Sequence, residues 1–234
     1  MITFNTNDQA PYDEETSRAQ ATAILSKLKD DSRVLDLGCG IGRVASHFPD
    51  VIHLEGVDKS SDLLAEYAQE TNATTHMLDL AVESDQLPKG PFDSVIMLGN
   101  TLMEFVDPIG TLHLFKQIAQ RLKEGGSFVI DDFPITGWRE VAAGNWCDGV
   151  DETGTMQMVW EEGEPIFALR RDKDVQPENW SVDPDERKFR LWSMGELRLL
   201  GGLTGLKEPK HDEEGAVVAM KRGESMLEET DLLS

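Results

Sequence analysis

The sequence predicts an α/β fold built on a mostly parallel sheet that carries helices on both faces. Three observations support this prediction. Segments of strand and helix character alternate between residues 14 and 130, and repeated βα units form parallel sheets. Ser127–Ile130 has an apolar run, which is typical of a strand covered on both sides. A glycine-rich turn directly follows Arg33–Leu37, the first predicted strand, as in sheets that bind a ligand at their carboxyl edge.

Each element in the first half of the chain has its own signal. Ala21, Ile24, Leu25 and Leu28 recur at helical spacing and predict a helix over Glu14–Lys29. The elements expected next are a strand at Arg33–Leu37, a short helical run through Phe48, a strand at Ile52–Val57, a helix capped by Ser60 and Ser61 that continues through Gln69, and strands at Thr74–Leu78 and Phe92–Leu98.

The second half begins with a well-marked helix. Asp107 caps this helix, Pro108 fits its first turn, and the pair Gly125 and Gly126 is expected to end it. After the strand Ser127–Ile130, segments of β character without intervening helices predict an antiparallel insert. The remaining expected elements are insert strands at Thr155–Trp160, Ile166–Arg171 and Lys188–Trp192, a helix at Met194–Leu203, and strands at Leu206–Lys210 and Ala216–Lys221.

We interpret residues 1–234 as one domain with three special segments. Residues 1–30 are expected to form an N-terminal helix and lid. Residues 150–193 are expected to form an inserted substrate lid. The acidic residues 223–234 are expected to be a flexible tail.

Composition excludes several classes of function. The 22 basic and 44 acidic residues give a net charge of −22, which repels the phosphates of nucleic acids. The chain has two cysteines and no arrangement typical of a metal site. Its first residues, MITFNTNDQAPYDEE, lack the basic start and apolar core expected of a signal peptide, and no apolar run approaches the length of a membrane span. We therefore expect a soluble, cytoplasmic monomer or homodimer that acts on a small molecule and binds neither nucleic acid nor membrane.

Three acids lie at or just after the ends of successive predicted strands and suggest an adenosine site. Asp36 stands two places before the first glycine of the turn, and Asp58 ends the next strand 22 residues later (58 − 36). A carboxylate at that place can accept two hydrogen bonds from a ribose diol. Asp79 ends the third strand, where it could accept a hydrogen bond from the adenine amino group.

The glycine turn does not match the two common phosphate-binding patterns. A nicotinamide cofactor requires GxGxxG, with the third glycine close to a pyrophosphate. This chain has GxGxG, and Arg43 stands where the last glycine of that motif would be. GxxxxGK[ST] is absent as well. The ligand is therefore expected to carry adenosine without phosphates.

Five ordered motifs now give a family resemblance. VLDLGCGIGR, EGVDKS, HMLDL, FDSVIMLGNTLMEF and LKEGGSFVIDDF resemble the class I S-adenosylmethionine-dependent methyltransferases, closely over Arg33–Phe133 and more loosely toward the C-terminus. The resemblance implies a Rossmann-like, doubly wound sheet of seven strands in the order 3-2-1-4-5-7-6, with the last-formed strand antiparallel. It also implies S-adenosylmethionine as cofactor and S-adenosylhomocysteine as product.

The resemblance further implies roles for individual residues. Around the methionine and ribose portions of the cofactor it places Asp36, Gly38, Cys39, Gly40 and Gly42, with Asp58 on the ribose. Around the adenine it places Lys59, Ser60, Asp79 and Leu80. Leu98, Gly99 and Asn100 would line the floor near the sulfonium, and Arg18 is a candidate partner for the cofactor carboxylate.

The sequence gives candidates, but no identity, for the acceptor side. Asp131, Asp132 and Tyr12 are candidate catalytic residues, and no metal is implied. The tetrad [DNS]PP[YFW] of methyltransferases that act on nucleic-acid amines is absent. The insert aromatics could wall a pocket, pack the insert on the sheet, or form a dimer contact; they are Trp160, Phe167, Trp180, Phe189 and Trp192.

We therefore predict a methyltransferase that acts on a small molecule, with an amine as one candidate. Two alternatives stay open at this point. One is a non-catalytic protein that binds S-adenosylmethionine or S-adenosylhomocysteine. The other is an enzyme that methylates protein side chains, for which an acidic groove would suit a basic peptide.

Overall fold

A seven-stranded sheet forms the centre of the molecule. The structure is a computed structural model that describes residues 12–224. The strands are β1 (Arg33–Leu37), β2 (His53–Asp58), β3 (Thr74–Met77), β4 (Phe92–Met97), β5 (Leu122–Asp131), β10 (Lys210–Asp212) and β11 (Val217–Lys221). Their order is β10-β11-β5-β4-β1-β2-β3, and β11 runs antiparallel to both neighbours while the other pairs are parallel. This is the order that the resemblance implies, so the predicted fold is confirmed.

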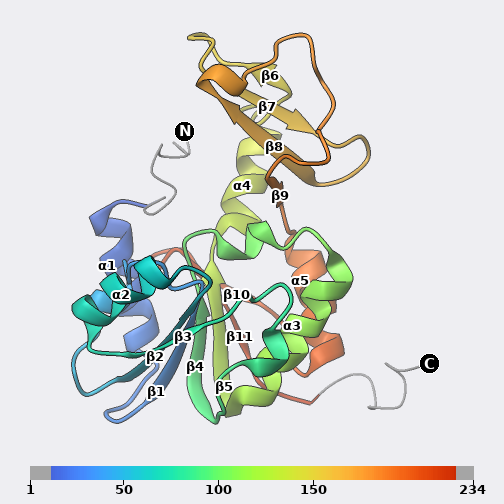
Figure 1. Cartoon of the computed structure of the whole chain (residues 1–234). Coiled ribbons are helices and arrows are strands. Elements are labelled where there is room, and N and C mark those ends of the chain that lie inside the picture. The colour runs from blue at the N-terminus through green and yellow to red at the C-terminus, as the bar shows by residue number, and fades with distance from the viewer. Residues whose placement is uncertain (1–11, 225–234) are drawn as a thin grey trace.

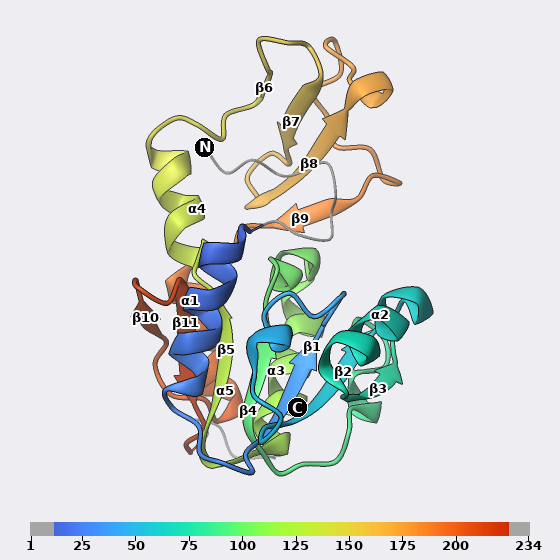
Figure 2. The same cartoon turned by 90° about the vertical axis from the view of Figure 1, so that its left-hand side faces the viewer.

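Helices cover both faces of the sheet (Figures 1 and 2). One face carries α1 (Glu14–Leu25) and α2 (Ser61–Thr71), and the other carries α3 (Pro108–Arg121) and α5 (Met194–Thr204). Short 3₁₀ turns lie at η1 (Ala45–His47), η2 (Ser84–Gln86), η3 (Thr101–Glu104) and η4 (Asp172–Asp174). Within residues 12–224, no helix has the length and apolar character needed to cross a membrane.

Successive strand residues supply the two halves of the core, because side chains alternate between the faces of a strand. In β1, Val34 packs in the cluster beneath α1, whereas Leu35 packs in the cluster beneath α3 and α5. Both side chains are fully buried. A strand with apolar residues on both faces is what a doubly wound sheet requires.

An insert stands beyond the carboxyl edge of this sheet (Figure 1). Helix α4 (Phe133–Ala142) leads from β5 into a second, antiparallel sheet in the order β6-β7-β8-β9. Its strands are β6 (Gly149–Val150), β7 (Met156–Trp160), β8 (Ile166–Arg171) and β9 (Lys188–Arg190). The predicted antiparallel character of the insert is therefore confirmed.

Most insert aromatics pack on one another. Phe167 is fully buried, and its ring lies 5.6 Å from Trp146, 4.9 Å from Trp160 and 5.6 Å from Phe189, measured between ring centroids. Rings at these separations form the hydrophobic centre of the small sheet. For Trp160, Phe167 and Phe189 the structure shows packing within the insert, whereas Trp180 is 51% exposed, and the dimer contact stays a prediction.

Several predicted boundaries were wrong for local reasons. Helix α1 ends at Leu25, where the Ser26 hydroxyl bonds the Ala23 carbonyl. The glycine pair does not end α3, because the chain enters β5 at buried Leu122, before the glycines. The last pair of strands starts later than expected, since Leu206 forms a single isolated bridge.

Helix α4 was missed altogether. Its sequence, FPITGWREVA, contains proline, glycine and β-branched residues, which are poor helix formers. Tertiary packing overrides that preference. Leu191 lies so close to Gly137 that a Cβ there would come within 2.6 Å of the leucine Cδ1. Residues 1–11 and 225–234, which include much of the expected lid and tail, lie outside the described part of the chain.

Candidate functional site

A cavity of about 700 Å³ opens at the carboxyl edge of the parallel strands. It follows the ends of β1, β2 and β4 and the segment after β3, which is where sheets of this topology bind ligands. Most of the predicted cofactor residues line it, namely Asp36, Gly38, Cys39, Gly40, Asp58, Lys59, Asp79, Leu80, Leu98 and Gly99. Further lining residues include Arg43, Leu63, Thr101, Glu104, Phe105 and Arg187.

The glycine turn brings backbone to the cavity wall. Gly38 has φ +65°, and a Cβ there would lie 2.5 Å from Thr101 Cγ2. Gly40 has φ +52° with open space where its Cβ would be. Glycine is therefore required at the first position by both backbone and space, and at the second it leaves the wall free for a ligand. Gly42 lies outside the cavity and packs against Tyr67.

Asp58 is held at the centre of the cavity wall by backbone donors. Its Oδ2 accepts a hydrogen bond from Gly40 N at 3.0 Å, and its Oδ1 accepts one from Ser60 N at 2.9 Å. A carboxylate has about four acceptor positions, so two remain for a ligand. Ser60 itself caps α2 by accepting from Leu63 N, and does not line the cavity.

Near β3 the cavity lining combines apolar side chains with one carboxylate. Leu63, Leu78 and Leu80 line it together with Asp79. The Asp79 carboxylate accepts a hydrogen bond from Ala81 N at 3.0 Å. Apolar side chains beside a fixed acceptor have the character needed for a heterocycle that carries an amino group.

Asp36 is a buried carboxyl that borders the same cavity. Its pKa is raised to about 7, chiefly by burial and to a lesser extent by the nearby carboxylates of Asp58 and Asp131. Tyr67 and Arg43 act in the opposite direction and lower the pKa of Asp36. The group therefore changes charge near neutral pH, and a cation placed beside it would favour its ionised form.

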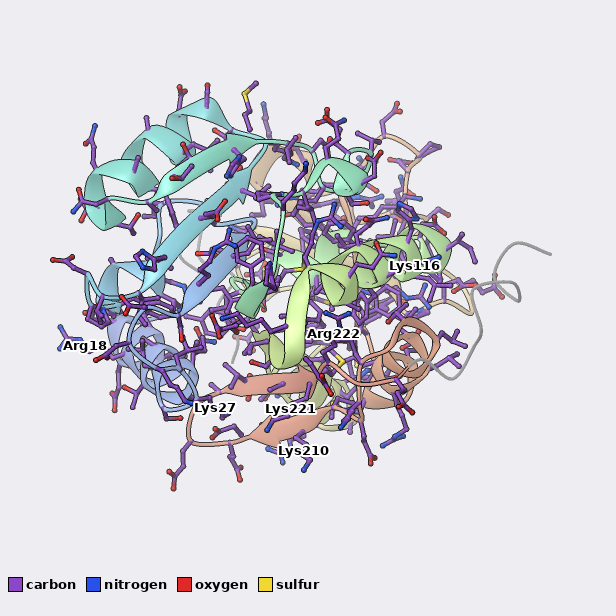
Figure 3. The ribbon with its side chains drawn as sticks, turned by 90° about the horizontal axis from the view of Figure 1, so that it is seen from below. Arg18, Lys27, Lys116, Lys210, Lys221 and Arg222 are labelled. Carbon is purple, nitrogen blue, oxygen red and sulfur yellow. The ribbon has the colours of Figure 1, made fainter. Side chains whose placement is uncertain are left out.

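The expected role of Arg18 does not fit its position. Arg18 is exposed, forms an ion pair with Glu14 at 2.8 Å, and points outward from α1 (Figure 3). Arg43 is the arginine that lines the cavity. Its Nη1 donates to Ser17 Oγ at 2.9 Å and its Nη2 to Gln20 Oε1 at 2.8 Å, so helix α1 holds the guanidinium in place.

Asp131 was expected near the acceptor, but it is fully buried and does not line the cavity. Its carboxylate accepts hydrogen bonds from Gln20 Nε2 at 2.8 Å and Asn100 N at 2.7 Å. Arg43 lies 3.9 Å away. Asp131 therefore joins α1 to the segment after β4. Asp131 does not face the acceptor as predicted, because protein groups surround its carboxylate.

Tyr12 and Asp132 also lie away from the cavity wall. The Tyr12 hydroxyl donates to Asn100 Oδ1 at 2.8 Å, and burial raises the pKa of Tyr12, so the hydroxyl stays a donor. Asn100 thus links the N-terminal segment to the sheet. Asp132 Oδ2 lies 3.5 Å from His211 Nε2, which places it against the C-terminal strands.

Three charged side chains form a bridge at the cavity wall. Glu104 Oε1 lies 2.7 Å from Arg187 Nη2, and Glu104 Oε2 lies 3.7 Å from Lys59 Nζ. Arg187 comes from the insert, Glu104 from η3, and Lys59 from the turn after β2. Because residues so distant in sequence meet only in the fold, no local pattern could have indicated the pair Glu104 and Arg187. The signal for Arg43 was present, since it directly follows the third glycine.

No group of three or more histidine, cysteine, aspartate or glutamate side chains suited to a metal ion occurs in the described part of the chain. The polar groups at the cavity are instead carboxylates, backbone amides and guanidinium groups. These match an organic ligand with a diol, an amino group and ionic ends.

Comparisons with known proteins agree with this geometry. Residues 6–207 match a family described as a methyltransferase domain. No curated protein sequence matches the chain at a significant level.

Solved structures share the fold. The CcbJ methyltransferase from Streptomyces caelestis has a TM-score of 0.64 and 19% identity, with 93% of this chain and 98% of that chain covered. SAM-bound CalS10, an amino pentose methyltransferase from Micromonospora echinaspora, has a TM-score of 0.58 and 16% identity, with coverage of 90% and 92%. The sugar N-methyltransferase KedS8 from Streptoalloteichus sp has a TM-score of 0.57 and 19% identity, with coverage of 90% and 88%.

Proposed function

The chain belongs to the class I S-adenosylmethionine-dependent methyltransferases, and on this premise we propose that it methylates an amine of a small molecule, with an amino sugar as the leading class of acceptor. The observation that carries the proposal is the cofactor cavity: in our assignment its Asp36, Asp58 and Asp79 carboxyls serve the cofactor, Glu104 is paired with Arg187, and no histidine lies among the described wall residues. A neutral amine attacks through its own lone pair, whereas a hydroxyl of high pKa needs a base beside it. CalS10 and KedS8, which share the fold, are described as acting on sugars.

The cavity fits the cofactor in size and in donor set. Its volume of about 700 Å³ lies in the range of small-molecule sites. In our assignment Asp58 holds the ribose diol and Asp79 and Leu80 hold the adenine edge. The amino-acid end lies between Asp36, which suits an ammonium, and Arg43, which suits a carboxylate.

When bound, S-adenosylmethionine supplies a methyl group on a sulfonium, which a nucleophile displaces in line. The work of this chain is therefore to align two reactants and to exclude water. Leu98 and Gly99 form the floor on which the acceptor nitrogen approaches. Arg187 links the insert to the cavity wall through Glu104, so the insert, which we assign to acceptor binding, is in contact with the cofactor site.

The test is to supply the full chain with methyl-labelled S-adenosylmethionine and a panel of primary and secondary amines that includes amino sugars, with the matching hydroxy sugars as controls. We expect label on amines and none on the hydroxy sugars. Label on protein in a cell lysate, with none on small molecules, would favour a protein methyltransferase instead. Saturable cofactor binding with no acceptor in either experiment would favour a non-catalytic binder.

Replacing Arg43 is expected to weaken binding of S-adenosylhomocysteine about tenfold, since a hydrogen bond to a charged group is lost. Arg43→Gln tests this by calorimetric titration. Arg18→Gln is the matched control, because Arg18 is exposed and paired only with Glu14 among the contacts described, and we expect unchanged affinity. A loss in the Arg18 variant that equals the loss in the Arg43 variant would contradict the assignment.

Binding is expected to strengthen with pH because of Asp36. In the folded protein the pKa of Asp36 is about 7, against an ordinary value of 3.8. Between these two values the folded state binds more protons than the unfolded state, so the contribution of Asp36 to the free energy of unfolding falls as pH rises. A bound ammonium favours the ionised form. Affinity for S-adenosylhomocysteine should therefore rise between about pH 6 and pH 8, by at most about tenfold per pH unit. Asp36→Asn should give weak binding with a flat pH profile, and an unchanged slope in that variant would contradict the account.

A further inference from the structure

Tyr67 of α2 lies fully buried beneath the glycine turn. Two glycines make room for its ring. A Cβ on Gly56 would lie 2.6 Å from Tyr67 Cε1, and a Cβ on Gly42 would lie 3.0 Å from Tyr67 Cδ2. Contacts under 3.0 Å do not occur between real atoms of this kind, so β2 carries a glycine at residue 56 because this ring is there.

The hydroxyl of Tyr67 has no hydrogen-bond partner of ordinary geometry within residues 12–224, although the oxygen is buried. A buried hydroxyl without a partner costs free energy. A phenylalanine would occupy the same space without burying an unpaired hydroxyl. Packing alone therefore does not explain why this residue carries a hydroxyl group.

Asp36 is the neighbouring residue with which the Tyr67 hydroxyl interacts. The Tyr67 hydroxyl interacts with that carboxyl closely enough to lower the pKa of Asp36. Burial and, in second place, Asp36 raise the pKa of Tyr67, so the phenol stays protonated and remains a donor. Asp36 borders the cavity, whereas Tyr67 does not. The carboxyl thus stands between the buried hydroxyl and the ligand.

The other charged groups around Asp36 do not replace this donor. Asp58 and Asp131 repel its charge, and Arg43 attracts it. Arg43 uses two of its N–H donors on Ser17 and Gln20 of α1, and in our assignment its remaining donors serve the carboxylate of the ligand. The Cys39 thiol stays protonated, because burial raises its pKa above the ordinary range.

We propose that Tyr67 is a positioning residue of the cofactor site: its hydroxyl donates a hydrogen bond to the ionised Asp36 carboxylate and orients it toward the ammonium at the amino-acid end of the ligand. The inference rests on the proposed function, because it needs a ligand with that ammonium. On binding, the carboxylate receives one hydrogen bond from each side, and the buried hydroxyl acquires its partner.

Tyr67→Phe tests the proposal with two ligands. S-adenosylhomocysteine carries the ammonium, and 5′-methylthioadenosine has the same adenosine without the amino-acid end. We expect Tyr67→Phe to weaken S-adenosylhomocysteine about tenfold, since a hydrogen bond to a charged group is removed, and to leave 5′-methylthioadenosine unchanged. The midpoint of the pH dependence of S-adenosylhomocysteine binding should move upward, because the variant loses a group that lowers the pKa of Asp36.

The outcomes separate the possible failures. A residue that serves packing alone would lower the thermal midpoint and weaken both ligands equally, whereas we expect an unchanged or higher thermal midpoint. Equal affinity of wild type and Tyr67→Phe for S-adenosylhomocysteine would overturn the role of Tyr67 and leave the proposed function in place. Failure of the folded wild type to bind either ligand would overturn the proposed function itself.

Discussion

Replacing Asp58 by alanine is expected to abolish measurable binding of S-adenosylhomocysteine, with a loss of about a hundredfold or more. The carboxylate has two acceptor positions left after its bonds to Gly40 N and Ser60 N, and each hydrogen bond from a ligand to a charged group contributes about 1.5–3 kcal/mol. The variant also removes the acceptor that fixes Gly40 at the cavity wall. Equilibrium titration of both proteins gives the ratio of affinities.

Asp58→Asn is the matched control for this change. The amide keeps the shape of the side chain and one acceptor oxygen, so we expect intermediate affinity. Circular dichroism shows whether each variant is folded. A folded Asp58→Ala protein that binds within about threefold of wild type would contradict the placement of the ribose.

Arg170→Met is expected to destabilise the insert by about 1.5–3 kcal/mol, because it removes hydrogen bonds from a buried guanidinium to partly buried partners. Only 2% of the Arg170 side chain is exposed. Its guanidinium contacts Glu186 at 2.5 Å and the backbone oxygens of Asn179 and Ser181 at 2.6 Å each. These bonds fix the loop between β8 and β9, which ends beside Arg187 at the cavity wall. Denaturant unfolding followed by tryptophan fluorescence measures the change.

Arg198→Met is the matched control for the loss of one arginine. Arg198 is 57% exposed and pairs with Glu208, itself 67% exposed, and pairs of this kind contribute at most about 1 kcal/mol. Faster proteolysis between β8 and β9 in Arg170→Met, and not in Arg198→Met, would locate the effect in the insert. Equal stability of the two variants would show that the buried arginine does not hold this loop.

The sheet could be predicted because its signals are local. Asp107 and Pro108 start α3, and β5 has the apolar middle of a strand covered on both faces. The glycine turn, Asp58 and Asp79 follow successive strands of a parallel sheet, whose topology brings strand ends to one edge. Their positions at the ends of successive strands are therefore enough to predict that they line one cavity.

The features that could not be predicted from the sequence depend on contacts between segments that are distant along the chain. Asp131 is buried because Gln20 and Asn100 close over it, and nothing in the residues next to it indicates this. Arg43 reaches the cavity because α1 lies beside the glycine turn. Helix α4 forms against its own propensity because it packs on Leu191 and Trp146.

The most direct test of the account is a crystal structure of the full chain with S-adenosylhomocysteine. We expect the ribose hydroxyls on the Asp58 carboxylate and the adenine beside Asp79 and Leu80. The amino-acid end is expected between Asp36 and Arg43. A ligand bound elsewhere, with Asp58 making no contact to it, would contradict the account.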